Sequence, residues 1–325
     1  MIKPNAASGI TLALVCLSIL AVMPVISNSR PEGFGALSFA FHLSLWQSMF
    51  AVPLLFWEWR RGERGVFAAG LDRRGVVRSL AVALATGAMF GLSTYLYVLG
   101  VEKAGAVSAA VAIQSYPLFA ILWETLFLKR RKTPVELGLT AVLIGALYYL
   151  GTGGTLRVDG VSIWFLVSLG VPFLWSIAHV VIKEEFGRTP ITPAQVTFFR
   201  VTISTLFLAV ALAIVEPEGF SAGVMRSELL IFAVIMGLVY YTELIVWFYA
   251  VRHIDVSLAS SITTPWPAFT MVLAAVVLGD QIALYQVLAF AVVALSIYGL
   301  TLAGLDKARA AGEAKVQELN GTKAD

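Results

Sequence analysis

Two charged residues, Arg200 and Glu243, lie deep inside apolar segments of the chain. Each is eight residues from the nearer end of its segment, which corresponds to a depth of about 12 Å in a bilayer at about 1.5 Å per residue. Ionisable residues at this depth are costly and usually face a bundle interior or a water-filled cavity. They can line a solute pathway and exchange partners during transport, or form a static ion pair between adjacent antiparallel helices that bring them within reach.

The preferred interpretation, a static ion pair or a role in the solute pathway, differs between Arg200 and Glu243. Removing one partner of a buried ion pair costs about 3–5 kcal/mol, so stability alone suffices to explain Arg200, and a static role is preferred there. Glu243 has aromatic neighbours on its own segment, Tyr240 and Trp247 among them. A role in the pathway is therefore preferred for Glu243, with proton coupling as a hypothesis.

His179 and His42 are the histidines placed within apolar segments. His179 can titrate near neutral pH, which makes it a third candidate for coupling or gating. A single histidine near a helix end is more often a local hydrogen-bond partner, and this alternative applies to both residues.

Prolines interrupt two apolar segments, at Pro117 in one and at Pro265 and Pro267 in the other. A proline removes a backbone donor and frees a carbonyl one turn earlier; in a membrane, only protein or a water-filled cavity can satisfy that carbonyl. Polar and aromatic side chains flank both sites, which suits organic solutes, including cations held against ring faces. Helix bending for packing alone is the alternative. The predicted substrate-binding residues are Gln114, Tyr116, Pro117, Thr263, Trp266 and Pro267, with Tyr95, Trp175, Tyr240 and Trp247 as further aromatic members.

Motifs for covalent chemistry are absent from the sequence. It has no phosphate-binding P-loop, no His-Glu-x-x-His or paired-cysteine metal site and no Gly-x-Ser-x-Gly elbow. Cys16 is the single cysteine, which excludes a disulfide scaffold. We therefore expect no enzymatic activity, no cofactor and no metal site.

The composition indicates which elements must position these residues. Of 325 residues, 59% are hydrophobic and 13% are charged, whereas soluble domains carry about 25% charged residues. Since a bilayer-spanning helix needs roughly 20 apolar residues, ten spans are predicted, and the expected class is an all-α polytopic membrane protein. The spans cover residues 8–27, 36–57, 78–99, 105–128, 135–152, 160–182, 192–215, 229–251, 256–279 and 283–304.

The lysines and arginines predict the orientation. With the N-terminus in the cytosol, 18 of the 23 lie in inner segments and four in outer ones. This bias favours ten spans with both termini cytosolic, in the cell inner membrane. The first span lacks the small-residue cleavage site of a secretory signal, so we expect it to be retained. Basic residues in short loops are a topology signal, so no nucleic-acid partner is predicted.

An internal repeat relates two stretches that lie 150 residues apart, 106–119 and 256–269. At this offset Tyr116 aligns with Trp266, and Pro117 with Pro267; elsewhere Gly87 aligns with Gly237 and Tyr148 with Tyr298. Each repeat holds five spans, an odd number, so the second copy enters the membrane from the opposite side. Inverted repeats of this kind build secondary transporters with a site near the midplane. The predicted units are residues 1–152 and 153–304, followed by a cytosolic tail, 305–325.

The chain resembles the drug/metabolite transporter superfamily, specifically its EamA-type ten-span members. The resemblance covers residues 8–304 and rests on the spans, the repeat and small-residue runs leading to the aromatic-proline pairs. It also rests on the stretch from Trp175 to Lys183 followed by Phe199-Arg200 in the next span. The first half departs from the pattern, because it has Gln47 after Trp46 where an arginine is expected, and no tryptophan matching Trp175. The halves are therefore not interchangeable.

This resemblance implies a secondary transporter of small organic metabolites, often amino acids or related compounds, and often an exporter. A channel-like facilitator and a flippase for lipid-linked carriers are the alternatives. The expected partners are a small-molecule solute and membrane lipid; proton coupling and uniport both remain open. The repeat makes a monomer self-sufficient.

Overall fold

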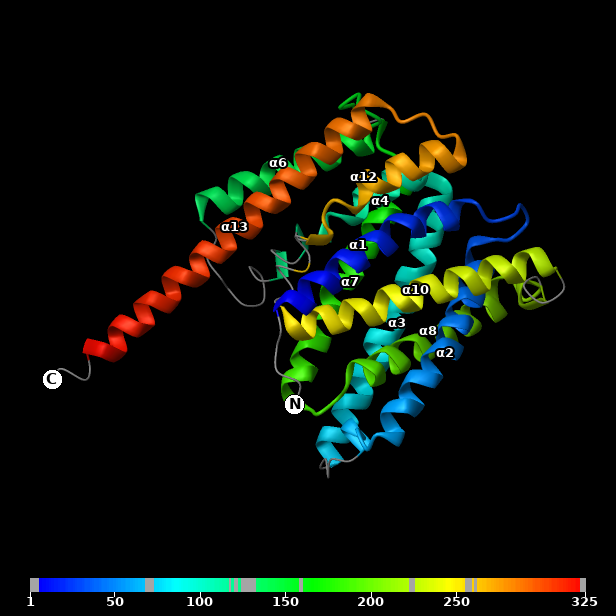
Figure 1. The fold of residues 1–325 in the computed structure, drawn as a ribbon. Coiled ribbons are helices and arrows are strands. Elements are labelled where there is room, and N and C mark those ends of the chain that lie inside the picture. Colours follow the sequence, from blue (N-terminus) through cyan, green and yellow to red (C-terminus); the bar gives the residue numbers. More distant parts are fainter. Residues whose placement is uncertain are drawn as a thin grey trace.

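The computed structural model describes residues 6–67, 73–116, 118–119, 122–123, 133–157, 160–221, 226–254, 259 and 262–321. Within these ranges the regular structure is helical throughout (Figure 1). The principal helices are α1 (Ala6–Asn28), α2 (Ala36–Arg60), α3 (Arg73–Ala104), α4 (Ala106–Ile113), α6 (Pro134–Gly151), α7 (Ile163–Arg188), α8 (Pro193–Val215), α10 (Ser227–His253), α12 (Trp266–Leu273) and α13 (Leu284–Gly321).

Eight helices in the described ranges are long and apolar enough to cross a membrane. They correspond to the predicted spans other than the fourth and ninth, and they confirm an all-α polytopic fold. The last helix, α13, continues without a break through the predicted tail to Gly321. In Figure 1 it packs along α6 at one side of the bundle and then projects beyond the other helices.

The outside of the bundle is apolar. Val276, Ile214 and Leu295 are 71–78% exposed, which is unfavourable in water but suits contact with lipid chains. The interior instead contains many of the small and hydroxyl residues, such as Ser93 and Thr270, both fully buried. Such residues allow close approach of membrane helices and hydrogen bonding between them.

The fourth and ninth spans are interrupted, as the prolines predict. Helix α4 ends at Ile113 and is followed by a turn at Gln114 and Ser115. Helix α12 begins at Trp266 after a turn at residues 264–265 and continues as a π-helical segment, Ala274–Leu278. Both interruptions place buried polar side chains inside the bundle, Gln114 and Ser115 at the first and Thr263 and Thr264 at the second.

Two helices begin with the same local signal. In α6, the Thr133 hydroxyl accepts from the Glu136 backbone N–H (3.1 Å), and the Glu136 side chain accepts from the Thr133 N–H (2.7 Å). In α8, Thr192 and Gln195 form the equivalent capping box. Proline occupies the first helical position in both, where its missing N–H costs nothing. The Thr-Pro-x-Glu/Gln pattern therefore specifies where these spans start.

Thr192→Ala is expected to destabilise the protein more than Thr133→Ala. Losing either cap costs about 1 kcal/mol, but the Thr192 hydroxyl also donates to Glu58 Oε2 on α2 at 2.6 Å, and Glu58 is 2% exposed. Weakening that buried carboxylate's hydrogen bonding adds about 1–3 kcal/mol. Thermal denaturation of the two purified variants in detergent measures the difference, and equal losses would contradict a clamp between α2 and α8.

Helix packing follows the predicted inverted repeat. The contact of α3 with α7 is matched by α10 with α1, that of α3 with α8 by α10 with α2, and that of α4 with α7 by α12 with α1. The pairs α2–α8, α4–α12 and α6–α13 each join a helix to its own counterpart. Figure 1 shows α1, α10 and α2 side by side, so helices of the two halves are interleaved rather than segregated.

Candidate functional site

A central cavity of about 90 Å³ lies among α1, α3, α7, α8, α10 and the two interrupted spans. A water molecule needs roughly 10–15 Å³ of such space, so the cavity holds several waters or a small organic group. Most of the predicted site residues line it. They are Gln114, Tyr116, Trp175, His179, Arg200, Tyr240, Glu243, Trp247, Thr263 and Trp266.

Two of the predicted residues that the structure describes do not line the cavity. Tyr95 is partly buried and packs against the core on α3, and Pro267 is buried without reaching the cavity surface. Pro117 lies outside the described residues. The interruption of the helix, rather than each residue beside it, is therefore what contributes to the cavity.

Arg200 does not form the expected pair with Glu243. Its guanidinium lies over the Phe90 ring, with Cζ 3.5 Å from the centroid, and the residue is 6% exposed. Among the described side chains no salt bridge joins it to Glu243. The expectation failed because α8 packs chiefly on α2 and α3, whereas α10 packs chiefly on α1 and α2, so α8 and α10 contact each other only slightly. Both charges nevertheless face the same cavity.

Among the described groups, the hydrogen-bond partner of Glu243 is the Cys16 thiol on α1, whose Sγ lies 3.5 Å from Glu243 Oε1; the charge of Arg200 also acts on this carboxyl group, without a salt bridge. Cys16 is fully buried and Glu243 is 9% exposed. A thiol is a weak hydrogen-bond donor, so this contact compensates little of the cost of burying a carboxylate. The carboxyl group therefore remains available to a ligand.

His179 lies within a set of aromatic rings. The ring centroids of Phe90, Tyr116, Trp247 and Trp175 lie 5.5, 5.8, 6.3 and 6.4 Å from that of His179. Its Nδ1 atom is buried without a hydrogen-bond partner among the described groups, so the local hydrogen-bond interpretation fails at this nitrogen. The rings of Tyr116, Trp175, His179 and Trp247 form one wall of the cavity, which we call the aromatic wall, whereas Phe90 does not line it.

His42 does make local hydrogen-bond contacts, as the alternative predicts. Its Nδ1 lies 2.8 Å from the Ser38 carbonyl oxygen, and its Nε2 lies 3.2 Å from the Phe220 carbonyl oxygen. It thereby ties α2 to the segment that precedes α10, away from the cavity.

Two buried tyrosine hydroxyls, of Tyr97 and Tyr240, face the cavity. Neither makes a hydrogen bond of acceptable geometry with any described group, although the Tyr240 hydroxyl lies beside Arg200. Their rings are 6.2 Å apart. Since an unpaired buried polar group costs about 1–3 kcal/mol, such groups call for water or ligand. The Tyr97 hydroxyl and His179 Nδ1 thus lack a partner among the described groups, and the Tyr240 hydroxyl lies beside Arg200.

Sequence reasoning missed the apolar part of the lining. Leu20 and Met23 come from α1, Ile297 from α13, and Ile113 and Leu244 from α4 and α10. Within an apolar span, no local sequence feature distinguishes an apolar residue that lines the cavity from one that packs in the core. The contact of Cys16 with Glu243 was likewise not predictable, because it arises from the packing of α1 on α10.

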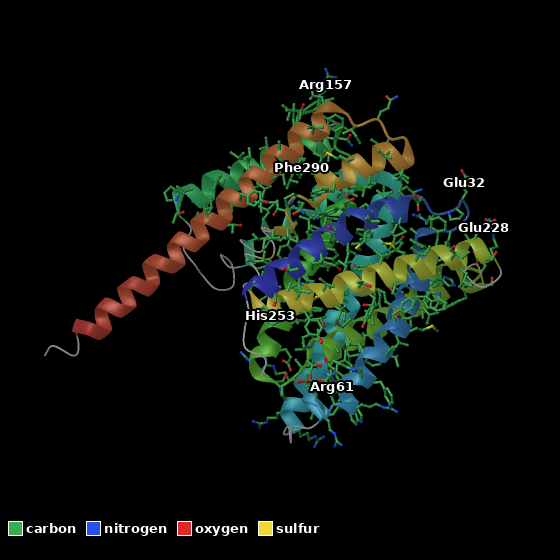
Figure 2. All side chains as sticks on the ribbon, viewed as in Figure 1. Glu32, Arg61, Arg157, Glu228, His253 and Phe290 are labelled. Carbon is green, nitrogen blue, oxygen red and sulfur yellow. The ribbon has the colours of Figure 1, made fainter. Side chains whose placement is uncertain are left out.

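Charged residues mark the two ends of the bundle. Figure 2 places Arg61 and His253 toward one end and Glu32 and Glu228 toward the opposite end. The ends of α2 and α10 thus lie together, as alternating spans require. The arginine-rich segment after α2 belongs to the first of these ends.

The fold and the cavity define a class: a polytopic helical membrane protein of inverted repeats around a polar and aromatic interior, an architecture found among membrane transporters. The chain belongs to the EamA-like transporter family, whose model matches residues 7–152 and 162–302. The resemblance inferred from the sequence is thereby confirmed.

Curated relatives of known role are distant. The pseudopaline exporter CntI in two strains of Pseudomonas aeruginosa is 28% identical over 125 residues. The match covers 38% of this chain and 41% of the relative, so it spans about two fifths of that protein's length. A solved crystal structure superposes with a TM-score of 0.61 at 14% identity, covering 92% of this chain and 99% of that one. This likeness establishes the fold alone.

Proposed function

We propose that the protein is a secondary transporter that exports small zwitterionic metabolites of the amino-acid type by alternating access. One observation carries the substrate class: Arg200 and Glu243 face the same cavity without pairing with each other. A relative that is itself an exporter supports the outward direction. The transporter resides in the cell inner membrane with both termini in the cytosol, acts as a monomer and catalyses no covalent chemistry.

A zwitterion would satisfy both buried charges at once. Its carboxylate fits the guanidinium fork, which favours planar two-oxygen partners, and its ammonium group fits the Glu243 carboxylate. The Tyr97 and Tyr240 hydroxyls and His179 Nδ1 supply further polar contacts. The aromatic wall accommodates the side chain of the solute and can also hold an ammonium group against a ring face.

The repeat supplies the conformational cycle. The main contacts between helices of different position have counterparts in the other half, as α3–α7 has in α10–α1 and α3–α8 has in α10–α2. Exchanging the conformations of the two halves therefore exchanges the side on which the cavity opens. Equilibrium movement in either direction follows from this geometry. Net export requires a driving ion, and Glu243 is the proposed proton-coupling residue.

Zwitterions are expected to raise the melting temperature of the detergent-purified protein. A ligand at 100 times its Kd stabilises the folded state by about 2.7 kcal/mol. The screen compares each L-amino acid with its amide, which lacks the carboxylate, and with its N-acetyl form, which lacks the ammonium. Shifts by zwitterions alone support the proposal; equal shifts by the masked compounds would refute the two-charge site. Counterflow in proteoliposomes then separates a carrier from a channel-like facilitator, which shows no counterflow.

A further inference from the structure

A second, smaller cavity adjoins the central one on the side of the arginine-rich end. Its volume is about 30 Å³, enough for a few waters or one small polar group. It lies between α3, α7 and α8 and is lined by Ser79, Val82, Ala83, Thr86, Ile182, Glu185, Ile191, Val196, Phe199 and Arg200. We call it the vestibule.

Arg200 lines both the vestibule and the central cavity. Its guanidinium rests on the Phe90 ring, which is 1% exposed and contacts the His179 ring of the aromatic wall. Arg200, resting on the Phe90 ring, therefore stands between the two spaces. A static role in stability does not by itself explain why a buried cation faces a cavity on each side.

Glu185 is the acidic group of the vestibule. Its side chain is 4% exposed, and its Oε1 accepts from the Ser79 hydroxyl at 2.5 Å. Its Oε2 has no hydrogen-bond partner among the described groups; the Arg78 guanidinium lies 3.7 Å away but is itself 43% exposed. A buried carboxylate oxygen therefore faces the vestibule and is only partly compensated by a solvated arginine.

We propose that the vestibule is the cytosolic station of the transport pathway, where Glu185 binds the ammonium group of the solute before Arg200 and Phe90 move apart. This inference rests on the proposed function and extends it. The order of charges along the path is then Glu185, Arg200, Glu243. The ammonium group of the solute passes from the Glu185 carboxylate to the Glu243 carboxylate. The carboxylate of the solute, which follows its ammonium group, then reaches Arg200.

Thiol labelling tests the location. Cys16→Ser removes the single thiol and keeps a hydroxyl donor beside Glu243. In that background, Ala83→Cys places a thiol in the vestibule, and Leu84→Cys places one on the outer face of α3, where Leu84 is 50% exposed. The probe is a membrane-impermeant quaternary-ammonium methanethiosulfonate. We expect Ala83→Cys to react about tenfold faster than Leu84→Cys, and only from the side that carries the termini. Equal rates, reaction from the other side, or no reaction overturns the proposal.

Glu185→Gln tests the chemistry of the vestibule. It is expected to slow labelling of Ala83→Cys by the cationic reagent about tenfold and to leave labelling by the anionic sulfonate reagent unchanged or faster, because only the charge has changed. Slowing of both reagents alike would show a collapsed vestibule and overturn the assignment of Glu185.

Phe90→Leu removes the ring under Arg200 and is expected to let the cationic reagent reach Leu244→Cys in the central cavity from the same side.

The two proposals fail in different ways. If zwitterions shift the melting temperature but Ala83→Cys stays unreactive, the zwitterion site in the central cavity is supported and the role of the vestibule in the pathway is refuted. If Ala83→Cys reacts as expected but zwitterions, amino-acid amides and N-acetyl amino acids shift the melting temperature equally, the pathway through the vestibule is supported and the zwitterionic substrate class is refuted.

Discussion

Glu243→Gln is expected to weaken the binding of zwitterions by about 100-fold and to leave the binding of N-acetyl amino acids little changed. Truncating one partner of a buried charge pair costs about 2–5 kcal/mol, and each 1.4 kcal/mol is tenfold in affinity. An N-acetyl amino acid has no ammonium group, so it loses nothing when the carboxylate of Glu243 becomes an amide. Specificity therefore shifts toward anions.

Arg200→Gln is expected to produce the opposite shift, with zwitterions weakened by a similar factor and amino-acid amides little affected. The two variants together test whether each charge contacts its own group on the solute. Titration of ligand-induced melting shifts measures the affinities, and uptake into proteoliposomes measures flux for the same three classes of compound.

Surface counterparts provide matched controls. Glu228 lies on the same helix as Glu243, and its side chain is 72% exposed and pairs with Arg226 at 3.8 Å. Glu228→Gln and Arg226→Gln make the same chemical changes outside the cavity and are expected to leave binding and flux unchanged, because exposed pairs contribute about 0–1 kcal/mol. If Glu243→Gln and Arg200→Gln weaken all three classes of compound equally, the two charges support the fold rather than recognise the solute.

The spans were predictable from the sequence because a membrane-spanning helix needs a continuous run of apolar residues, which is a local property of the chain. A helix in lipid satisfies its own backbone and needs apolar side chains over about 20 residues, and both conditions are visible along the chain. The interrupted spans were equally visible, since proline acts on its own helix. The Thr-Pro starts at residues 133 and 192 belong to the same class of local signal.

The relation between Arg200 and Glu243 was not predictable in this way. Sequence adjacency of their helices suggested a pair, but inverted repeats interleave the two halves, and α10 packs on α1 and α2 instead. What a charge contacts in the interior depends on helix packing across the repeat, which hydropathy does not encode. For the same reason, no local pattern in the sequence connects Cys16, Phe90 or Glu185 with the cavity.

The repeat also explains why equivalent glycines occupy two crossings. A Cβ atom on Gly87 of α3 would lie 2.5 Å from Ile203 Cβ on α8, and one on Gly237 of α10 would lie 2.7 Å from Trp46 Cβ and 2.8 Å from the Leu43 carbonyl oxygen on α2. The α3–α8 and α10–α2 contacts are counterparts. At both, only a hydrogen atom fits between the helices.

Gly237→Ala is therefore expected to lower the free energy of unfolding by about 1–3 kcal/mol, the usual cost of overpacking, and Gly237→Leu to prevent folding. The clash with the Leu43 carbonyl is with backbone, so no side-chain rotation relieves it. Thermal denaturation in detergent measures the change, with Gly87→Ala expected to behave alike.

Gly145→Ala on α6 is the control, because no described atom beyond its own stretch of helix lies within 4 Å of the Cβ position there. Alanine in an open helical position is expected to stabilise by about 0.5–1 kcal/mol relative to glycine, the opposite sign from Gly237→Ala. If the Gly237 variant matched this gain, α10 and α2 would not approach as closely as the structure shows. The rigid crossings on which exchange between the two halves depends would then have to lie elsewhere in the bundle.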